Sequence, residues 1–206
     1  MNFLKNSLLL GALLALSISS FAGMAQELDD PFVKIDKISQ QLITIINLHQ
    51  KDFPSNEKQY FKALSSLLDD SVDFNHISNK VMGLYRAKAT TTQKKLFAKK
   101  FRQGLVETYG RGLINYGDQK IVLENRVPLK EGQRFLVVSQ EIRSSDNTFS
   151  LKYSMARKKT GEWMVINMNI SGINLREIFR NQFSQAAQKS SGNLDVVIAG
   201  WISKID

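Results

Sequence analysis

The sequence contains no cysteine among its 206 residues and only two histidines. The absence of cysteine excludes disulfides, thiol catalysis and cysteine-ligated metal sites. His49 and His76 fall in different predicted helical regions and neither belongs to a metal-ligand motif, so both are interpreted as surface or capping residues. The sequence therefore predicts no metal site and a protein that is stabilised by its own hydrophobic core.

Catalytic motifs are missing as well. The chain has no HExxH, no GxSxG, no phosphate-binding loop and no Rossmann fingerprint. Asp69, Asp70 and Asp73 cluster between two predicted helices, where aspartates usually act as helix caps. The sequence therefore predicts neither an enzyme nor a protein that carries a cofactor.

Long apolar runs are also scarce, and the one clear run is short. Residues 8–18 are apolar, Lys5 precedes them, and Gly23-Met24-Ala25 follows as a small-x-small cleavage site. This layout predicts a secretory signal peptide at residues 1–25 that is removed before Gln26. A run of that length is too short to cross the ~30 Å hydrocarbon core of a bilayer. Residues 26–206 are predicted to form a single, secreted domain.

The chain is basic, with a formal net charge of +9. Its basic residues are scattered, and the densest group is Lys94-Lys95 with Lys99-Lys100. They do not alternate with aromatic residues as on a surface that stacks nucleic-acid bases. We therefore expect no nucleic-acid partner, and we interpret the charge as a solvated surface.

Apolar residues recur at helical spacing in the first half of the chain and again near its end. Asp30 before Pro31 marks the start of the first helix, Ser55 the start of the second, and Asn193 the start of the last. Thr90 and Gln93 have the spacing of a capping box at the start of the longest helix. The predicted helices cover residues 31–46, 55–68, 74–82, 90–113, 175–183 and 193–202.

After Gly117 the apolar period changes to two, which is typical of strands. The predicted strands cover residues 120–127, 133–142, 148–158 and 163–170, and Ser171-Gly172 ends the last one. Short connections favour an antiparallel meander. Helices followed by an antiparallel sheet and then by more helices indicate an α+β fold.

Two arrangements satisfy these patterns. The helices can pack tightly on each other and on one face of the sheet, or they can arch over the sheet and leave a cavity. Periodicity alone favours the solid core.

Six segments in order resemble the MlaC family of periplasmic phospholipid-binding proteins of the toluene-tolerance type. They are VDF at 72–74 leading to Val81-Met82-Gly83-x-Tyr85, the long helix with Phe97, Phe101 and Tyr109, WMVINM at 163–168, SGINL at 171–175, FRNQF at 179–183 and GNLD at 192–195. Three positions depart from the family pattern. Asn167 stands for an aspartate, and Ser171 and Asn174 stand for a glutamate and a serine, so a polar contact made by that turn is not carried over.

The resemblance implies an NTF2-like fold, in which a curved antiparallel four-stranded sheet is clasped by about six helices around an apolar pocket. It also implies a monomeric periplasmic carrier without catalytic activity. Such a carrier moves phospholipid between an outer-membrane lipoprotein complex and an inner-membrane ABC-transporter lipid complex, and so maintains the lipid asymmetry of the outer membrane.

A carrier of this kind must bury acyl chains. Exposure to water costs about 0.8 kcal/mol per methylene, or about 12 kcal/mol for a chain of ~15 methylenes, whereas one hydrogen bond contributes only ~0.5–1.5 kcal/mol. The resemblance therefore implies an apolar wall and a head group left in water. The candidates for head-group rim residues are Arg86, Lys88 and Arg180, each of which could instead be a solvated surface residue. Each candidate for the lipid-binding wall could equally belong to an ordinary core. These candidates are Phe74, Ile77, Val81, Met82, Phe97, Phe101, Leu105, Tyr109, Leu151, Tyr153, Trp163, Val165, Ile173, Leu175, Phe179 and Phe183.

Two other functions stay open at this point. An NTF2-like cone can host an enzyme that acts on a small hydrophobic substrate, with Asp73 and either Tyr109 or Tyr153 as the acid–base pair. The chain could also be an interaction module that binds a protein through its basic face without any ligand.

Overall fold

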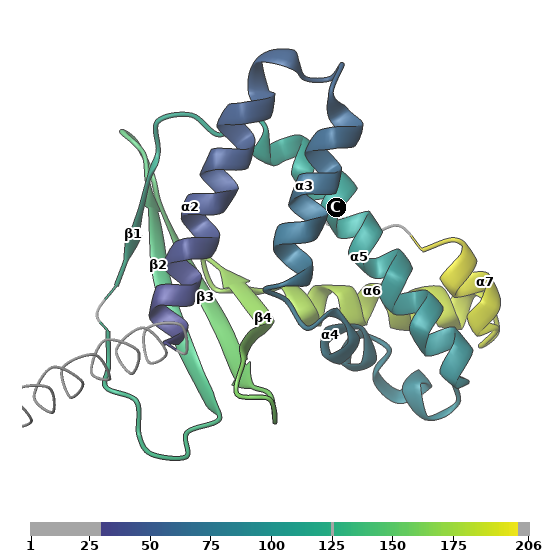
Figure 1. Ribbon diagram of the computed structural model, residues 1–206. Helices are drawn as coiled ribbons and strands as arrows, with labels where there is room; N and C mark the ends of the chain where they lie inside the picture. The colour runs from purple at the N-terminus through teal and green to yellow at the C-terminus, as the bar shows by residue number, and fades with distance from the viewer. Residues whose placement is uncertain (1–29, 125, 202–206) are drawn as a thin grey trace, which may run out of the picture.

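The computed structural model describes residues 30–124 and 126–201, so the predicted signal peptide lies outside the described residues. Figure 1 shows an open sheet on one side of the molecule and helices on the other. The α-helices are α2 (Pro31–His49), α3 (Glu57–Asp69), α4 (Phe74–Val81), α5 (Thr91–Leu113), α6 (Leu175–Lys189) and α7 (Leu194–Ala199), and the short 3-10 helices are η1 (Gln50–Asp52) and η2 (Gly83–Ala87). The predicted mixture of helices and antiparallel sheet is confirmed. Within the described ranges, no helix combines the length and the apolar character needed to cross a membrane.

Most of the predicted helix starts are confirmed by their caps. The Asp30 side chain accepts hydrogen bonds from the backbone N–H groups of Phe32 and Val33. Thr90 and Gln93 form the reciprocal capping box before α5. The prediction of Ser55 as a cap was wrong, because α3 starts at Glu57 after Asn56. Asn56 makes no cap bond, since its side-chain amide donates to the His49 carbonyl at 3.1 Å and ties the start of α3 to the end of α2.

The sheet has the order β1-β2-β3-β4-β5, with every neighbouring pair antiparallel. Its strands are β1 (Lys120–Leu123), β2 (Phe135–Arg143), β3 (Thr148–Arg157), β4 (Trp163–Ile170) and β5 (Ile173–Asn174). The four predicted strands are confirmed, but the fifth, two-residue strand was not predicted. It forms because Ser171 (φ 47°) and Gly172 (φ 88°) turn the chain back, so that Ile173 pairs with Ile170.

The predicted end of the first strand at Val127 was wrong. β1 stops at Leu123, although the Glu124 N–H still donates to the Ser139 carbonyl of β2 at 3.0 Å. Arg126 forms an ion pair with Asp30 at the start of α2, and its guanidinium lies 5.9 Å from the centre of the Phe32 ring. The chain therefore leaves the sheet before it reaches Val127, which is exposed.

One segment of the helical part joins the sheet directly. Ser71 to Asp73 runs beside the first half of β4, and Val72 forms a parallel bridge with Val165. The Asp73 N–H donates to the Val165 carbonyl at 3.0 Å, and the Val165 N–H donates to the Ser71 carbonyl at 2.9 Å. The free edge of β4 is thus shared between this segment and β5.

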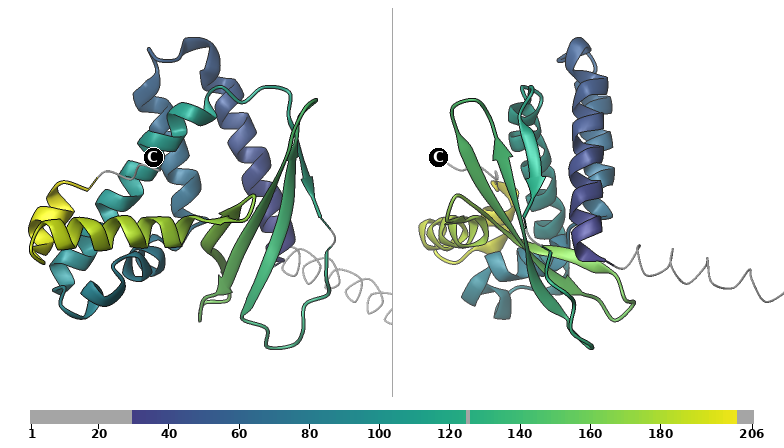
Figure 2. Two further views of the ribbon diagram at one scale, coloured as in Figure 1. Left: turned by 180° about the vertical axis from the view of Figure 1, so that it is seen from behind. Right: turned by 90° about the vertical axis from the view of Figure 1, so that its left-hand side faces the viewer.

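Helix α2 covers one face of the sheet, here called the inner face. Phe32 and Ile35 pack there against Val138, Met155 and Trp163. The Ser39 hydroxyl donates to the buried side-chain carbonyl of Gln140 at 3.0 Å, which fixes α2 on β2. The right-hand view in Figure 2 shows the opposite face of the sheet without a described helix in front of it.

Two further clusters stabilise the helices. Ile46 of α2, Tyr60 and Leu64 of α3 and Val106 of α5 form one of them. The other is the largest, and we call it the aromatic cluster because its rings come from α4, α5, α6 and the segment after α7. It contains Phe74, Ile77, Val81, Met82, Ala89, Phe97, Phe101, Phe179, Phe183, Ala187, Leu194, Val197, Ile198 and Trp201.

Candidate functional site

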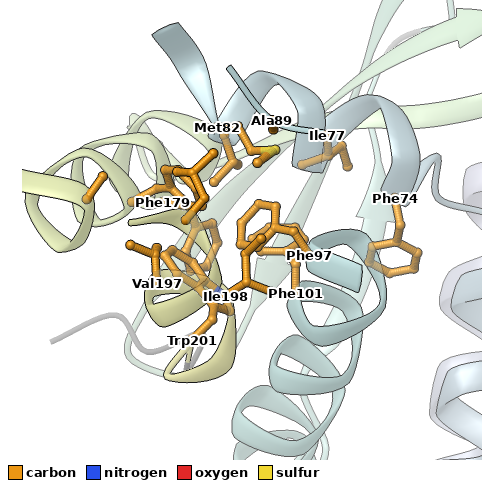
Figure 3. Packing of buried hydrophobic residues seen from close by; sticks show 14 residues of the cluster. Phe74, Ile77, Met82, Ala89, Phe97, Phe101, Phe179, Val197, Ile198 and Trp201 are labelled. Carbon is orange, nitrogen blue, oxygen red and sulfur yellow. The ribbon is translucent and has the colours of Figure 1, made fainter. Parts of the chain in front are cut away.

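Many of the predicted wall residues belong to the aromatic cluster. Phe97 and Phe101 stand one turn apart on α5, and Phe179 and Phe183 do so on α6. Edge contacts join the two helices, with ring centres 4.8 Å apart for Phe97 and Phe183 and 5.2 Å apart for Phe101 and Phe179. Figure 3 shows Phe97, Phe101 and Phe179 converging with Ile198 and Trp201. The predicted wall residues in this cluster, which pack against one another, are Phe74, Ile77, Val81, Met82, Phe97, Phe101, Phe179 and Phe183.

A second set of predicted wall residues lies at the border of the aromatic cluster. Leu105 and Tyr109 continue the α5 stripe of Phe97 and Phe101, and Leu175 begins α6. All three pack against the cluster but stay only partly buried. The apolar stripe of α5 therefore extends beyond the region where α6 and α7 cover it.

The remaining predicted wall residues come from the sheet. Trp163 and Val165 belong to the cluster under α2, and Tyr153 packs against that cluster while partly exposed. Leu151 is buried and, two residues before Tyr153 on β3, lies on the same face of the sheet. Ile173 pairs with Ile170 at the end of the same face, but 54% of its surface is exposed and it belongs to neither cluster.

The inner face is only partly covered by helices. Helix α2 contacts β1 and β2, and α4 and α6 contact β4, but within the described part of the chain α3 and α5 make no extensive contact with any strand. Figure 1 shows the sheet joined to the helices through α6 and the segment that enters α4. Five partly buried apolar side chains border the aromatic cluster or the cluster under α2, and Val72 borders both. We call them the inner apolar surface: Val72, Leu105, Tyr109, Tyr153 and Leu175.

Two of the residues that connect the clusters were not among the predicted wall residues. Val72 packs against both the aromatic cluster and the cluster under α2, and Leu68 packs against both the aromatic cluster and the cluster between α2, α3 and α5. Leu68 was visible in the apolar stripe of its helix, but periodicity does not reveal which residue lies where clusters meet.

The Tyr153 phenol is one of two phenols in the inner apolar surface, the other being that of Tyr109. Burial raises the pKa of Tyr153 well above the ordinary value for tyrosine, so the hydroxyl is uncharged at neutral pH. An uncharged hydroxyl adds little polarity to this surface, and the surface as a whole suits an apolar ligand.

The departures from the family pattern have separate structural roles. Asn174 caps α6, since its side chain accepts from the Glu177 N–H at 3.4 Å, and asparagine and serine are both good capping residues. Ser171 adopts the left-handed conformation that starts the turn into β5. Asn167 is buried in β4, and its side-chain oxygen has no hydrogen-bond partner among the described residues.

The structure brings the three predicted rim residues to one corner. Arg86 belongs to η2 and donates to the Asn79 side chain at 3.2 Å, and Lys88 follows η2 directly. The aliphatic part of Arg180 on α6 lies against Gly83, at the start of the same 3-10 helix. Arg86, Lys88 and Arg180 are all exposed to solvent.

Asp73, the acid of the alternative acid–base pair, has a structural role. Asp73 caps α4, and its carboxylate accepts from the His76 N–H at 2.8 Å. Burial lowers the pKa of His76, although the Asp73 charge opposes this effect. Asp69 forms an ion pair with Arg102. In the described ranges, histidine and acidic side chains form no group of three that could hold a metal ion.

The fold and the inner apolar surface together define a class of protein. It is an α+β protein with an open antiparallel sheet, backed by helices that leave some apolar side chains of the inner face only partly buried. More specifically, the chain belongs to the MlaC protein family, whose model matches residues 36–203. The predicted family is thereby confirmed.

Individual proteins agree with this assignment. The chain is 28% identical over 191 residues to the toluene tolerance protein ttg2D of Pseudomonas putida, a match that covers 91% of this chain and 87% of that protein. Its fold is similar to that of a phospholipid-binding protein from Ralstonia solanacearum solved in complex with a phospholipid. That match has a TM-score of 0.68 at 21% identity and covers 82% of this chain and 93% of the other.

Proposed function

We propose that this protein is a periplasmic phospholipid carrier that encloses acyl chains between its sheet and its helices. Membership of the MlaC family and the similarity to a toluene tolerance protein support this function. The similarly folded Ralstonia protein binds a phospholipid, which indicates the chemical class of the ligand. The leader-like residues 1–25 are consistent with export to the periplasm.

The inner apolar surface is the observation that carries the proposal. Its side chains come from β3, α5, α6 and the segment before α4, and they are apolar but only partly buried. Since transfer of acyl chains out of water is favourable by about 0.8 kcal/mol per methylene, a continuous apolar surface stabilises the bound lipid more than any head-group contact. We infer that the tails cover this surface, and that Arg86, Lys88 and Arg180 face the head group.

The carrier needs no chemical step. Lipid enters and leaves by exchange between apolar surfaces, and the direction of transport is set by the membrane complexes with which the carrier exchanges lipid. We propose that these partners are an outer-membrane lipoprotein complex and an inner-membrane ABC-transporter complex, and that the exchange maintains outer-membrane lipid asymmetry. The carrier works as a monomer of one domain.

A space-filling substitution on α5 tests the proposal. Leu105→Trp enlarges a partly buried side chain of the inner apolar surface, so we expect the purified variant to lose most of its bound phospholipid. Leu96→Trp is the matched control, because Leu96 lies on the same helix but is 44% exposed. Native mass spectrometry of freshly purified protein measures the mass increment of one lipid.

The two variants must differ for the proposal to stand. Both are expected to keep their circular dichroism spectra, and only Leu105→Trp is expected to lack the lipid increment. Equal lipid content in both folded variants, or no lipid in the unmodified protein after incubation with phospholipid vesicles, would count against the carrier function.

A further inference from the structure

A basic groove follows the seam between α3 and α5 on the molecular surface and continues to the hairpin between β3 and β4. It consists of two adjoining hollows of about 400 and 250 Å³ that share Lys99 and Arg102. We call it the α3–α5 groove. Its lining residues are Phe61, Lys62, Ser65, Asp69, Val72, Asp73, Phe74, Asn75, Lys95, Ala98, Lys99, Arg102, Gln103, Val106, Glu107, Lys158 and Met164.

The cations of the groove are largely unpaired, whereas its acids are engaged. Lys62, Lys95, Lys99 and Lys158 form no ion pair with any described residue. Arg102 pairs with Asp69, and its buried Nε has no hydrogen-bond partner in the described part of the chain. The groove therefore keeps a positive charge that its own acids do not neutralise.

The acids other than Asp69 keep their charge, but five cations line the groove against three carboxylates, so the lining retains a net charge of +2. Asp73 caps α4, and the Glu107 carboxylate accepts from the Gln103 side chain at 2.9 Å. On α5 itself, Lys95 and Lys99 stand four residues apart, a spacing at which like charges destabilise a helix. This row of unpaired cations does not stabilise the isolated protein, which suggests that it meets an anionic partner.

Part of the floor of the groove is apolar. Ala98, Val106 and Met164 are buried there beneath the lysines. Along α5 the groove extends from Lys95 to Glu107, which corresponds to about 18 Å at 1.5 Å per residue. A groove of this length, with cations above an apolar floor, is too extended for a single small anion and matches a peptide segment with acidic and apolar side chains.

We propose that the α3–α5 groove docks an acidic amphipathic segment of a partner protein. The apolar side chains of the segment contact the floor, and its carboxylates pair with Lys62, Lys95, Lys99 and Lys158. The docking surface is lined by a different set of side chains from the inner apolar surface, apart from Val72. The inference therefore stands whether or not the chain carries lipid.

A synthetic helical peptide of about five turns, with leucines on one face and glutamates on the other, serves as the probe. We expect Lys95→Glu combined with Lys99→Glu to weaken its binding about tenfold or more, measured by fluorescence anisotropy. The control is Lys37→Glu combined with Lys51→Glu, which makes the same change in net charge at exposed positions of α2 and η1. It is expected to change binding by less than about twofold.

A second groove variant, Lys62→Glu combined with Lys158→Glu, repeats the test at both ends of the groove. High salt should weaken the binding of the probe peptide to the groove. A peptide with lysines in place of the glutamates should not bind. All variants are expected to retain their bound lipid, so a failure here is distinguishable from a failure of the carrier function. Equal weakening by the groove and control variants, or binding to phosphatidylglycerol-containing vesicles in place of the acidic peptide, would overturn the proposal.

Discussion

At the scale of single residues, Gly110 sets how closely α3 and α5 approach. A methyl group at this position would lie 2.9 Å from the Leu64 Cδ1 atom and 3.0 Å from the Phe61 ring. The Tyr60 hydroxyl donates to the Gly110 carbonyl at 2.9 Å in the same contact. Burial raises the pKa of Tyr60 to about 12, so this hydroxyl remains a donor throughout the physiological range.

Two glycines of α5 provide a matched test of that contact. Gly110→Ala should destabilise the protein, because overpacking of about 1–3 kcal/mol exceeds the gain in helix propensity of about 1 kcal/mol. Gly112→Ala should instead stabilise it by about 0.5–1 kcal/mol, because nothing lies within 4 Å of the added atom. Urea denaturation measures both free energies of unfolding, and a Gly110→Ala variant as stable as Gly112→Ala would contradict the close approach.

At the scale of elements, α5 contributes side chains to the aromatic cluster, to the inner apolar surface and to the α3–α5 groove. Phe97 and Phe101 anchor it in the aromatic cluster, Leu105 and Tyr109 continue the same stripe, and Lys99 belongs to the groove on another side. Two sets of hydrogen bonds fix the start of α5. The capping box satisfies its first N–H groups, and the Gln93 side chain also donates to Asp195 of α7 at 2.9 Å.

The capping box at the start of α5 should contribute to the stability of the protein. Thr90→Ala removes the acceptor of the Gln93 N–H bond, and we expect a loss of about 1 kcal/mol in the free energy of unfolding. Thr91→Ala, one residue inside the exposed first turn, should change it by less than about 0.5 kcal/mol. Chemical denaturation of the two variants compares them, and equal losses would show that the cap contributes no specific stability.

At the scale of the whole molecule, the sheet and the aromatic cluster are joined mainly along β4. The segment from Ser71 to Asp73 pairs with its first half, and β5 leads from its end directly into α6. The inner apolar surface lies beside these connections. A ligand that covers it would contact the sheet and the helices together, and so would stabilise the whole fold.

Removal of lipid should therefore lower the thermal stability. A ligand present at 100 times its Kd stabilises the folded state by about 2.7 kcal/mol, which corresponds to roughly 5–10 °C in Tm for a protein of this size. We expect delipidated protein to melt lower by an amount in this range and to recover after incubation with phospholipid vesicles. Identical melting curves for the loaded and the delipidated protein in differential scanning calorimetry would argue against a ligand that joins the two parts.

Sequence reasoning predicted local features well. The caps at Asp30, Thr90 and Asn193 are confirmed, and so is the strand at residues 163–170, because each depends on neighbouring residues only. It failed where a distant residue decides the outcome. Arg126, beyond the end of β1, pairs with the distant Asp30, and the strand β5 forms by pairing with the edge of β4.

For the candidate site, too, the sequence predicted what depends on local spacing and not what depends on distant residues. Apolar periodicity identified Phe97, Phe101, Phe179 and Phe183 as inward-facing, and all four are buried. It could not distinguish them from Leu105 and Leu175, which have the same spacing but lie where the helices no longer cover each other. The exposure of Ile173 was likewise not predictable, because it depends on the pairing of the short strand β5 with the end of β4.

The amino-acid sequence by itself determined the order and type of the main helices and strands, most of the helix starts and the membership of a family, because periodicity, capping and short motifs act over a few residues. Only the tertiary structure decided which apolar side chains pack into a solid cluster and which remain partly uncovered beside the sheet. It also decided that lysines from α3, α5 and the β3–β4 hairpin line one groove. Both outcomes depend on contacts between residues far apart in the chain, which no local pattern records.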